Sequence, residues 1–251
     1  MKKRIIARLD IKNEYVIKGI HLEGLRKVGN PNELAKKYYV QGIDEIIFMD
    51  AVAAYYDRNS LSEIIKEASK DIFVPITVGG GIRKISDIQE ALNAGADKVA
   101  INTQAIQDPE FIAQASKIFG SQCIVSSIVA KKTAPNKWEA YVENGREPTG
   151  VDVVEWAKKV QALGAGEIML TSIDKEGTKK GFDLELNSAV SSAITIPLIT
   201  SGGAGNKEDI VDILTIEGID AVALASILHY NILQIDTIKN SLSLEKIEVR
   251  I

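Results

Sequence analysis

A repeated motif divides this sequence into two similar halves. The run Ile76–Ile82, ITVGGGI, passes from β-branched residues into glycines, and the run Ile199–Gly205, ITSGGAG, does the same. The first glycines of these runs, Gly79 and Gly202, lie 123 residues apart. An internal repeat is the feature to look for first, because missing it leads to the wrong fold. The sequence therefore predicts one structural half that is written twice.

The repeat extends well beyond the glycine runs. Three further pairs of segments match at offsets of 123, 122 and 119 residues, and the third match is the loosest. The pairs are Asp97–Thr103 with Asp220–Ser226, Gly42–Phe48 with Gly164–Leu170, and Arg8–Lys12 with Ser127–Lys131. Together these matches indicate a duplicated half of a fold.

Strand-like and helix-like segments alternate along the chain. Strands are expected at about residues 4–10, 45–49, 74–78, 98–101, 123–129, 167–170, 197–200 and 221–224. Helices are expected at about 31–41, 60–70, 85–94, 109–119, 151–163, 184–192, 207–216 and 232–242. Eight such units in 251 residues predict a closed (β/α)8 TIM barrel with an internal half-barrel repeat, as a single domain over residues 1–251. An open doubly wound sheet is the alternative, but it does not explain the repeated half.

Two segments fall outside this alternation. Residues 11–30 are polar and contain glycines, so we expect them to form a loop. The run Trp138–Val142 precedes Asn144-Gly145, a dipeptide typical of a two-residue hairpin turn. We therefore expect a β-hairpin there, early in the second half.

Composition excludes several classes of protein. A net charge of −4 and a pI near 5.4 argue against an extended nucleic-acid-binding surface. No apolar run reaches the roughly 20 residues needed to cross a bilayer, and we expect a cytoplasmic protein with no membrane contact. The single cysteine fits a reducing compartment, and the two histidines lack metal-ligand spacing. We therefore expect no metal, and the hypotheses developed below need no cofactor either.

The glycine runs are candidate phosphate sites. In barrels of this type phosphate commonly sits at the loops after the seventh and eighth strands. Glycine N–H groups and a following helix N-terminus hold phosphate without a basic cluster. The expected phosphate-binding residues are Gly203, Ala225 and Ser226 in these loops, and Gly81, Asn102 and Thr103 across the mouth. Two facing sites suit a substrate with a phosphate at each end, although tight turns without a ligand are the alternative interpretation.

Several motifs of this chain match one known family. They are Arg4-Ile5-Ile6-Ala7, Thr77–Ile82, Gly95–Val99 with Ile101-Asn102-Thr103, Phe119–Gln122, Leu170–Asp174 with Gly177-Thr178, and Ser201–Gly205. With these motifs the chain resembles, over essentially its whole length, the cyclase subunit of imidazole glycerol phosphate synthase, the HisF family. The resemblance adds Gly177 to the expected phosphate-binding residues.

The resemblance implies a route for ammonia through the barrel. In that family a partner glutaminase makes ammonia, which passes along the barrel interior to a bisphosphorylated aminoimidazole precursor at the mouth. Asp10 and Lys18 match catalytic positions of the family. Its ring of alternating charges at the opposite face, where ammonia enters, is matched by Arg4, Glu45, Lys98 and Glu167. Ordinary stabilisation of that face is the alternative interpretation of these four residues.

Two departures from the family affect catalysis. Val129 stands where the second catalytic aspartate belongs, and Arg8 replaces a small residue just before Leu9-Asp10. Valine cannot transfer a proton, whereas one acid or base typically contributes about 100- to 10,000-fold to a rate. Because alternate residues of a strand share a face, we expect Arg8 to pair with Asp10, or failing that with Asp50. An arginine at about 4–6 Å lowers a carboxyl pKa by roughly 1–3 units, which makes Asp10 a poorer base.

The leading hypothesis is a HisF-like paralogue that docks a HisH-type glutaminase as a heterodimer and carries ammonia to another acceptor. The resemblance implies such relatives in surface-polysaccharide pathways, where a sugar amidotransferase converts an N-acetylated sugar into an amidine. Whether the barrel is itself an enzyme is left open. The alternatives are an authentic cyclase (a lyase) of histidine biosynthesis, with Glu176 or Asp50 replacing the missing acid, and a generic phosphosugar-binding barrel.

Overall fold

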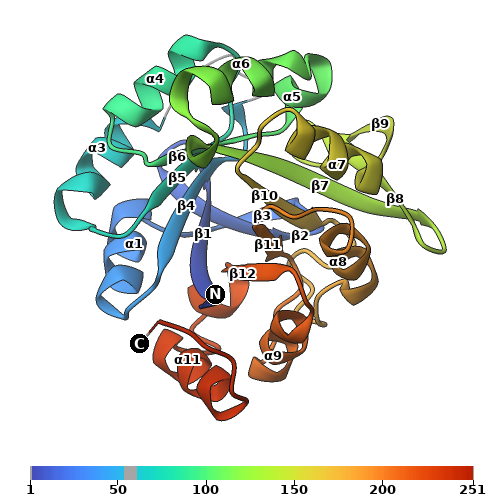
Figure 1. Cartoon of the computed structure of the whole chain (residues 1–251). Coiled ribbons are helices and arrows are strands. Elements are labelled where there is room, and N and C mark those ends of the chain that lie inside the picture. Colours follow the sequence, from blue (N-terminus) through green and yellow to red (C-terminus); the bar gives the residue numbers. More distant parts are fainter. Residues whose placement is uncertain (1, 54–60, 251) are drawn as a thin grey trace.

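A closed barrel of parallel strands forms the centre of the molecule (Figure 1). The structure is a computed structural model, and it describes residues 2–53 and 61–250. In this part of the chain, eight strands pair in parallel, and β12 pairs with β1 to close the barrel. They are β1 (Arg4–Lys12), β4 (Glu45–Asp50), β5 (Ile76–Gly79), β6 (Lys98–Ile101), β7 (Ile124–Ala134), β10 (Glu167–Ser172), β11 (Leu198–Ser201) and β12 (Ile219–Leu224). The predicted (β/α)8 barrel is confirmed.

Helices cover the outside of the barrel, one after each strand. They are α1 (Pro31–Val40), α3 (Ser62–Asp71), α4 (Ile85–Asn93), α6 (Glu110–Phe119), α7 (Val153–Ala162), α8 (Leu184–Ser191), α9 (Lys207–Thr215) and α11 (Ile235–Leu244). Two short helices, α5 (Thr103–Gln107) and α10 (Ser226–His229), and a 3₁₀ turn at Ser121–Cys123 complete the helical elements of the described residues. Each long helix returns the chain to the end of the barrel where strands begin. Among the described residues, no helix is both long and apolar enough to cross a bilayer.

The predicted boundaries agree with the structure to within a few residues, with one clear error. Residues 11–30 are not a loop, because β1 extends to Lys12 and the chain then forms a hairpin of β2 (Tyr15–Ile20) and β3 (Glu23–Gly29). Its turn places His21 and Leu22 at positive φ, without the Asn-Gly or Asp-Gly signal that identifies such turns. The expected helix at 60–70 begins at Ser60, outside the described residues.

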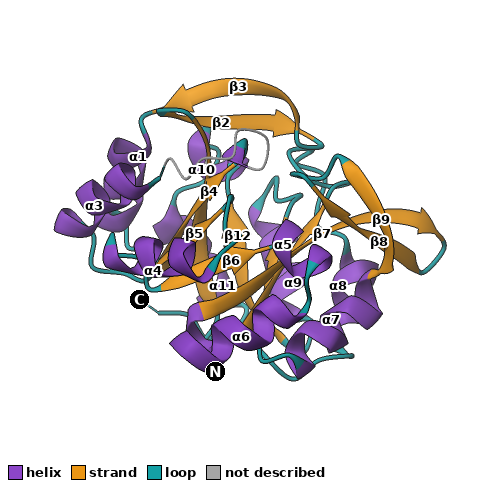
Figure 2. Ribbon diagram, turned by 90° about the horizontal axis from the view of Figure 1, so that it is seen from above, coloured by secondary structure: helices purple, strands orange, loops and turns teal. Residues whose placement is uncertain are grey.

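The hairpin expected around Asn144-Gly145 is present. Strands β8 (Lys137–Val142) and β9 (Glu147–Asp152) pair antiparallel with each other, and β8 also pairs with the outer end of β7. Figure 2 shows that β8–β9 and the β2–β3 hairpin lie at the same end of the barrel, away from the two termini. This end, which we call the mouth, is where the parallel strands finish.

Side chains of the strands form two separate cores. Outward-facing residues such as Ile5, Ala7 and Leu9 join the large core between strands and helices. Inward-facing residues form a second apolar cluster inside the barrel. Its members are Ile6, Ile47, Met49, Ala100, Val125, Met169, Ile199, Ala221 and Ala223. Because side chains alternate along β1, Arg4, Arg8 and Asp10 share the interior face with Ile6.

Candidate functional site

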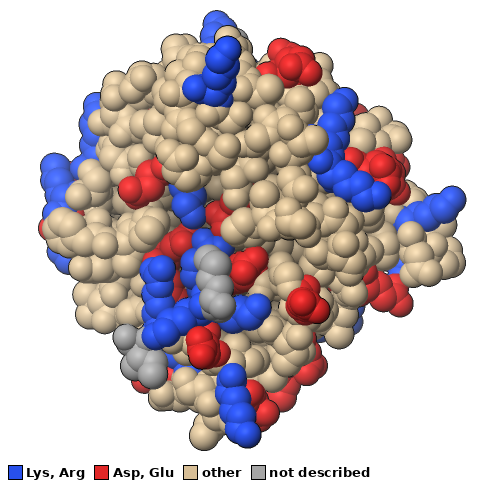
Figure 3. All heavy atoms as spheres, in the orientation of Figure 1, with Lys and Arg blue, Asp and Glu red and all other residues tan. Residues whose placement is uncertain are grey.

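Four charged side chains form a closed ring at the end of the barrel where strands begin. Arg4 donates to Glu45 (Nη1 to Oε1, 2.7 Å) and to Glu167, and Lys98 Nζ lies 3.2 Å from Glu45 Oε2 and 2.9 Å from Glu167 Oε2. Each acid therefore bridges both cations. Figure 3 views this end and shows charged side chains gathered near its centre, with a broad area free of Lys, Arg, Asp and Glu above them and to their right.

The four ring residues are largely buried, so each of their charges needs an opposite charge beside it. The side chains of Arg4, Glu45 and Glu167 are at most 8% exposed, and that of Lys98 is 19% exposed. Burial by itself lowers the pKa of Arg4, but the two adjacent glutamates outweigh burial and raise it. Removing one member would leave buried charge uncompensated. The structure thus brings together all four residues singled out in the sequence.

At the mouth, Arg8 and Asp10 form the ion pair expected from their shared face. Arg8 Nε donates to Asp10 Oδ1 at 2.8 Å, and the Arg8 residue is only 3% exposed. The guanidinium also reaches across the barrel, donating from Nη1 to Thr171 Oγ1 at 2.9 Å and to Ser201 Oγ at 3.2 Å. Asp50, the alternative partner, instead accepts the backbone N–H of Val52 at 2.9 Å.

Lys18 links Asp10 to a second buried carboxylate. Its Nζ lies 3.1 Å from Asp10 Oδ2 and also pairs with Glu176. Burial alone would raise the pKa of Asp10, but Arg8 and Lys18 together hold it well below its usual range. The pKa of Lys18 is raised because Glu176 and Asp10 outweigh the effect of burial. Asp10 is therefore a stabilised carboxylate and a weak base.

Val129 lies in an apolar environment. It packs with Leu22 and Ile173, and the half-buried Tyr141 lies against them. No proton donor comes from this position, where the family has an acid. The carboxylate connected to Asp10 is that of Glu176, on the other side of Lys18. It lies on the loop after β10 and is one of the two residues, with Asp50, that the sequence offers as a substitute acid.

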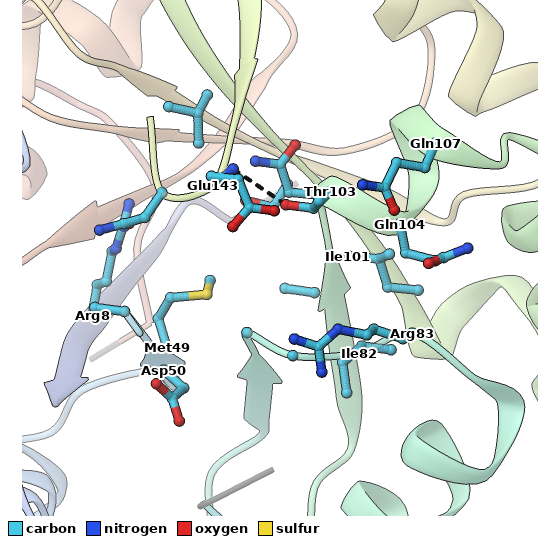
Figure 4. A pocket seen from close by; sticks show the side chains of 18 residues that line it. Arg8, Met49, Asp50, Ile82, Arg83, Ile101, Thr103, Gln104, Gln107 and Glu143 are labelled. Atoms are coloured by element: carbon cyan, nitrogen blue, oxygen red, sulfur yellow. Dashed lines mark hydrogen bonds between the residues drawn. The ribbon is translucent and has the colours of Figure 1, made fainter. Parts of the chain in front are cut away.

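One group of expected phosphate-binding residues lines a cavity of about 240 Å³. Gly81, Asn102 and Thr103 all border this cavity, and so do Arg8 and Val129. Figure 4 shows Arg8 and Arg83 on opposite sides of it, with Glu143 between them. The β8–β9 turn is attached here, because Thr103 Oγ1 accepts the N–H of Glu143 at 3.3 Å. The cavity therefore extends from the glycine turn to the Arg8 guanidinium.

The second group lies around two adjoining pockets. Gly203, Ala225, Ser226 and Gly177 line a small pocket of about 20 Å³. Gly177 and Ser226 also line an open cavity of about 510 Å³ that carries Lys18, Arg26 and Lys179. Gly203 has φ +120° and its α-carbon faces the carbonyl of Gly181 so closely that a β-carbon would clash. The glycine there permits a close approach of two loops.

Three residues of the site were not expected individually from the sequence. Thr171 and Ser201 contact Arg8, and they follow from strand alternation once the register of the barrel is known. His229, in α10, is 6% exposed, and its Nδ1 lies 2.8 Å from the Tyr38 hydroxyl. Burial lowers the pKa of His229 to about 4. Across residues 2–53 and 61–250, no cluster of three or more His, Cys, Asp or Glu side chains could hold a metal.

Comparisons with known proteins agree with this geometry. A family model described as "Histidine biosynthesis protein" matches residues 4–234. "Imidazole glycerol phosphate synthase subunit HisF" of Legionella pneumophila is 59% identical over 206 residues, which are 82% of this chain and 97% of that protein. The proteins of the same name from Lactococcus lactis subsp. cremoris strains MG1363 and SK11 are each 48% identical, over 100% of this chain and 97% of the relative. Identity of this extent, spread over the whole barrel, shows that the chain belongs to the HisF family.

Proposed function

We propose that this chain is the HisF-type subunit of an imidazole glycerol phosphate synthase. In this role it receives ammonia from a HisH-type glutaminase and uses it to cleave and cyclise a phosphorylated substrate at the mouth. The observation that carries the proposal is the identity to proteins of this name, 59% over 82% of this chain and 48% over all of it. This order of preference reverses the leading hypothesis from the sequence, because the relatives give glycosyl amidation no support.

The face around the charged ring supports docking of a partner. Four large apolar side chains are exposed at or just beyond the C-terminal ends of helices, next to the starts of the strands. They are Val40 at 77%, Phe73 at 76%, Ile118 at 54% and Leu244 at 83% exposure. Exposed apolar residues that cluster on one face mark interaction surfaces. A glutaminase seated on this ring would release ammonia directly over Arg4 and Lys98.

The mouth supports binding of a substrate with two phosphates. Gly81, Asn102 and Thr103 border one cavity, and Gly177 and Ser226 border the other. Lys18, Arg26 and Lys179 around the second cavity add positive charge, which favours an anion. Between the two cavities lies the Arg8–Asp10–Lys18–Glu176 network.

Cyclisation needs a proton acceptor and a proton donor. Asp10 is the acceptor in this proposal, and Glu176 supplies the second carboxyl group in place of Val129. Both carboxylates are buried and both bind the Lys18 ammonium, so the proton that Glu176 delivers to the substrate comes from Lys18 and is shielded from water. The depressed pKa of Asp10 predicts slower proton abstraction than an unpaired aspartate would give.

The test uses the purified chain, excess ammonium and the bisphosphorylated aminoimidazole substrate. Turnover that falls by about 100-fold or more in both Asp10→Asn and Glu176→Gln supports the proposal. Asp174→Asn, on the same loop as Glu176, is the matched control for loss of a carboxylate. Absence of turnover in the wild-type chain, with glutaminase stimulation intact, would overturn the cyclase role.

Val129 and Arg8 favour a second candidate function. In it the barrel docks a glutaminase and passes ammonia to a separate acceptor enzyme, such as a sugar amidotransferase. In a barrel that no longer catalyses cyclisation, the acid can be replaced by a hydrocarbon such as Val129. Asp10 can then be bound by a cation such as Arg8. This candidate predicts that the chain stimulates a glutaminase yet never converts the aminoimidazole substrate. Transfer of nitrogen from glutamine to an N-acetylated sugar, in the presence of the amidotransferase, would support it.

A further inference from the structure

Arg8 spans the interior of the barrel near the mouth. Its backbone is in β1, while its Nη1 donates to Thr171 in β10 and to Ser201 in β11. In the barrel order β10–β11–β12–β1, β10 is three strands away from β1, so the side chain crosses most of the lumen. Of the two strands between them, β12 contributes Ala223, whose small side chain leaves room for this crossing.

From Arg8 towards the end of the barrel where the strands begin, the interior is first apolar. It is then closed by the charged ring. Ile6 follows Arg8 inward on β1, and Val125 and Met169 belong to the same apolar cluster. Arg4 comes next on β1 and belongs to the ring with Glu45, Lys98 and Glu167. The barrel interior is therefore arranged in layers, with buried charge at both ends and mainly hydrocarbon between, where Thr77 adds one hydroxyl.

We propose that Arg8 is the exit gate of the barrel interior, which closes the apolar section from the mouth until its guanidinium swings aside. The ring at the other end closes the entrance, so the section between is sealed on both sides. Arg8 also lines the 240 Å³ cavity, and that cavity offers space for the guanidinium to move into. An anionic group of a bound ligand in this cavity would attract the guanidinium away from Thr171 and Ser201.

The gate discriminates between the two forms of ammonia. A fixed guanidinium next to an apolar section repels ammonium, while neutral ammonia needs only a transient opening. This use of the gate rests on the proposed function, since it assumes that ammonia passes through the barrel. Closure of the interior by Arg8 does not depend on that assumption and is tested separately.

The test measures access to a cysteine placed below Arg8. In a Cys123→Ser background, Val125→Cys puts a thiol in the apolar section, where Val125 is 1% exposed. The neutral reagent methyl methanethiosulfonate labels this thiol at a rate set by opening of the interior. We expect Arg8→Ala to accelerate labelling by about tenfold or more, because a hydrogen bond to a charged group is typically worth at least about one decade in an equilibrium constant. Arg8→Met keeps a long side chain but removes its hydrogen-bond donors, and we expect it to accelerate labelling as well.

A second thiol distinguishes opening of the interior from general loosening. Val222→Cys, in the same background, places a thiol in the large core between strands and helices, where Val222 is 0% exposed. Arg83→Ala removes another arginine of the same cavity and is the control for lost charge. Faster labelling at position 125 alone, in both Arg8 variants and not in Arg83→Ala, supports the gate. Equal acceleration at both thiols, or none at position 125, overturns it. If the gate is found but glutamine nitrogen never reaches a substrate, the closure stands and the proposed function fails.

Discussion

Arg8 Nε and Asp10 Oδ1 lie 2.8 Å apart on the inner side of β1, and this pair defines the mouth of the barrel. A carboxylate bound on one side by Arg8 and on the other by Lys18 is held ionised. A catalytic base works best when its pKa lies near the working pH. The geometry therefore lets this barrel bind an anionic substrate while it keeps Asp10 a slow proton acceptor.

Removal of Arg8 is expected to raise the pKa of Asp10. Burial alone disfavours the carboxylate, and in Arg8→Ala only Lys18 remains to oppose burial. We expect a rise of about 1–3 units, the usual effect of one adjacent opposite charge. Titration of the aspartate carboxyl carbons by NMR measures it. Arg83→Ala is the control, and an unchanged Asp10 titration in Arg8→Ala would contradict the electrostatic role of the pair.

His229 is expected to make folding stability depend on pH. Burial lowers its pKa from the ordinary 6.5 to about 4, so between these values the unfolded chain binds the proton and the folded chain does not. Stability is then fully present above pH 6.5 and falls, by about 1.4 kcal/mol per pH unit, as the pH drops towards 4. Urea unfolding of wild type and His229→Gln measures this slope. His21→Gln, which replaces the second of the two histidines, is the control and should retain the slope.

Loss of Lys98 is expected to disturb the entrance but not the mouth. In Lys98→Ala, Glu45 and Glu167 share only Arg4, and the ring no longer closes. We expect glutamine-dependent transfer to decrease while transfer from free ammonium is retained. The measurement is product formation with each nitrogen source, in the presence of a HisH-type glutaminase. Lys66→Ala, an exposed lysine paired with Glu63 in α3, is the control. Equal loss with both nitrogen sources would indicate a defect of the whole fold.

Phe73 is expected to anchor the glutaminase. Phe73 is 76% exposed beside α3, and its ring packs edge-on against Tyr39 with 6.3 Å between the ring centroids. Most of its surface is therefore available to a partner. Phe73→Ala should weaken binding by about 1 kcal/mol or more, as for a central interface residue. Titration calorimetry with a HisH-type glutaminase measures the change. Leu184→Ala, which removes an exposed leucine from the mouth end, should bind normally.

An acid at position 129 is expected to increase cyclisation. The position is surrounded by Leu22 and Ile173, and an apolar environment raises a carboxyl pKa and so favours a proton donor. The double variant Val129→Asp with Arg8→Ala should convert the aminoimidazole substrate about 100-fold faster than wild type or more. The rate should decline as rising pH deprotonates the new acid. Val129→Asn in the same Arg8→Ala background separates polarity from proton donation, and equal rates for the two would contradict this reasoning.

Much of the site could be predicted from strand alternation. Arg8 and Asp10 share a phase on one strand, so their pairing required only the sequence and a β conformation. The four ring residues could be named because each begins a strand and matches the family. The β2–β3 hairpin was missed because its turn places His21 and Leu22 at positive φ, and this pair is not the Asn-Gly or Asp-Gly signal of such turns.

By itself, the sequence determined the repeated half, the barrel and the residues that face its interior, because these follow from periodicity within short segments. Only the tertiary structure decided which of those residues meet. Closure of the barrel brings Thr171 within 2.9 Å of Arg8, although 163 positions separate them along the chain. It also makes Lys18 the link between Asp10 and Glu176. Such contacts depend on the stagger between strands and on how the β2–β3 hairpin folds over the mouth, and no local pattern of residues encodes either.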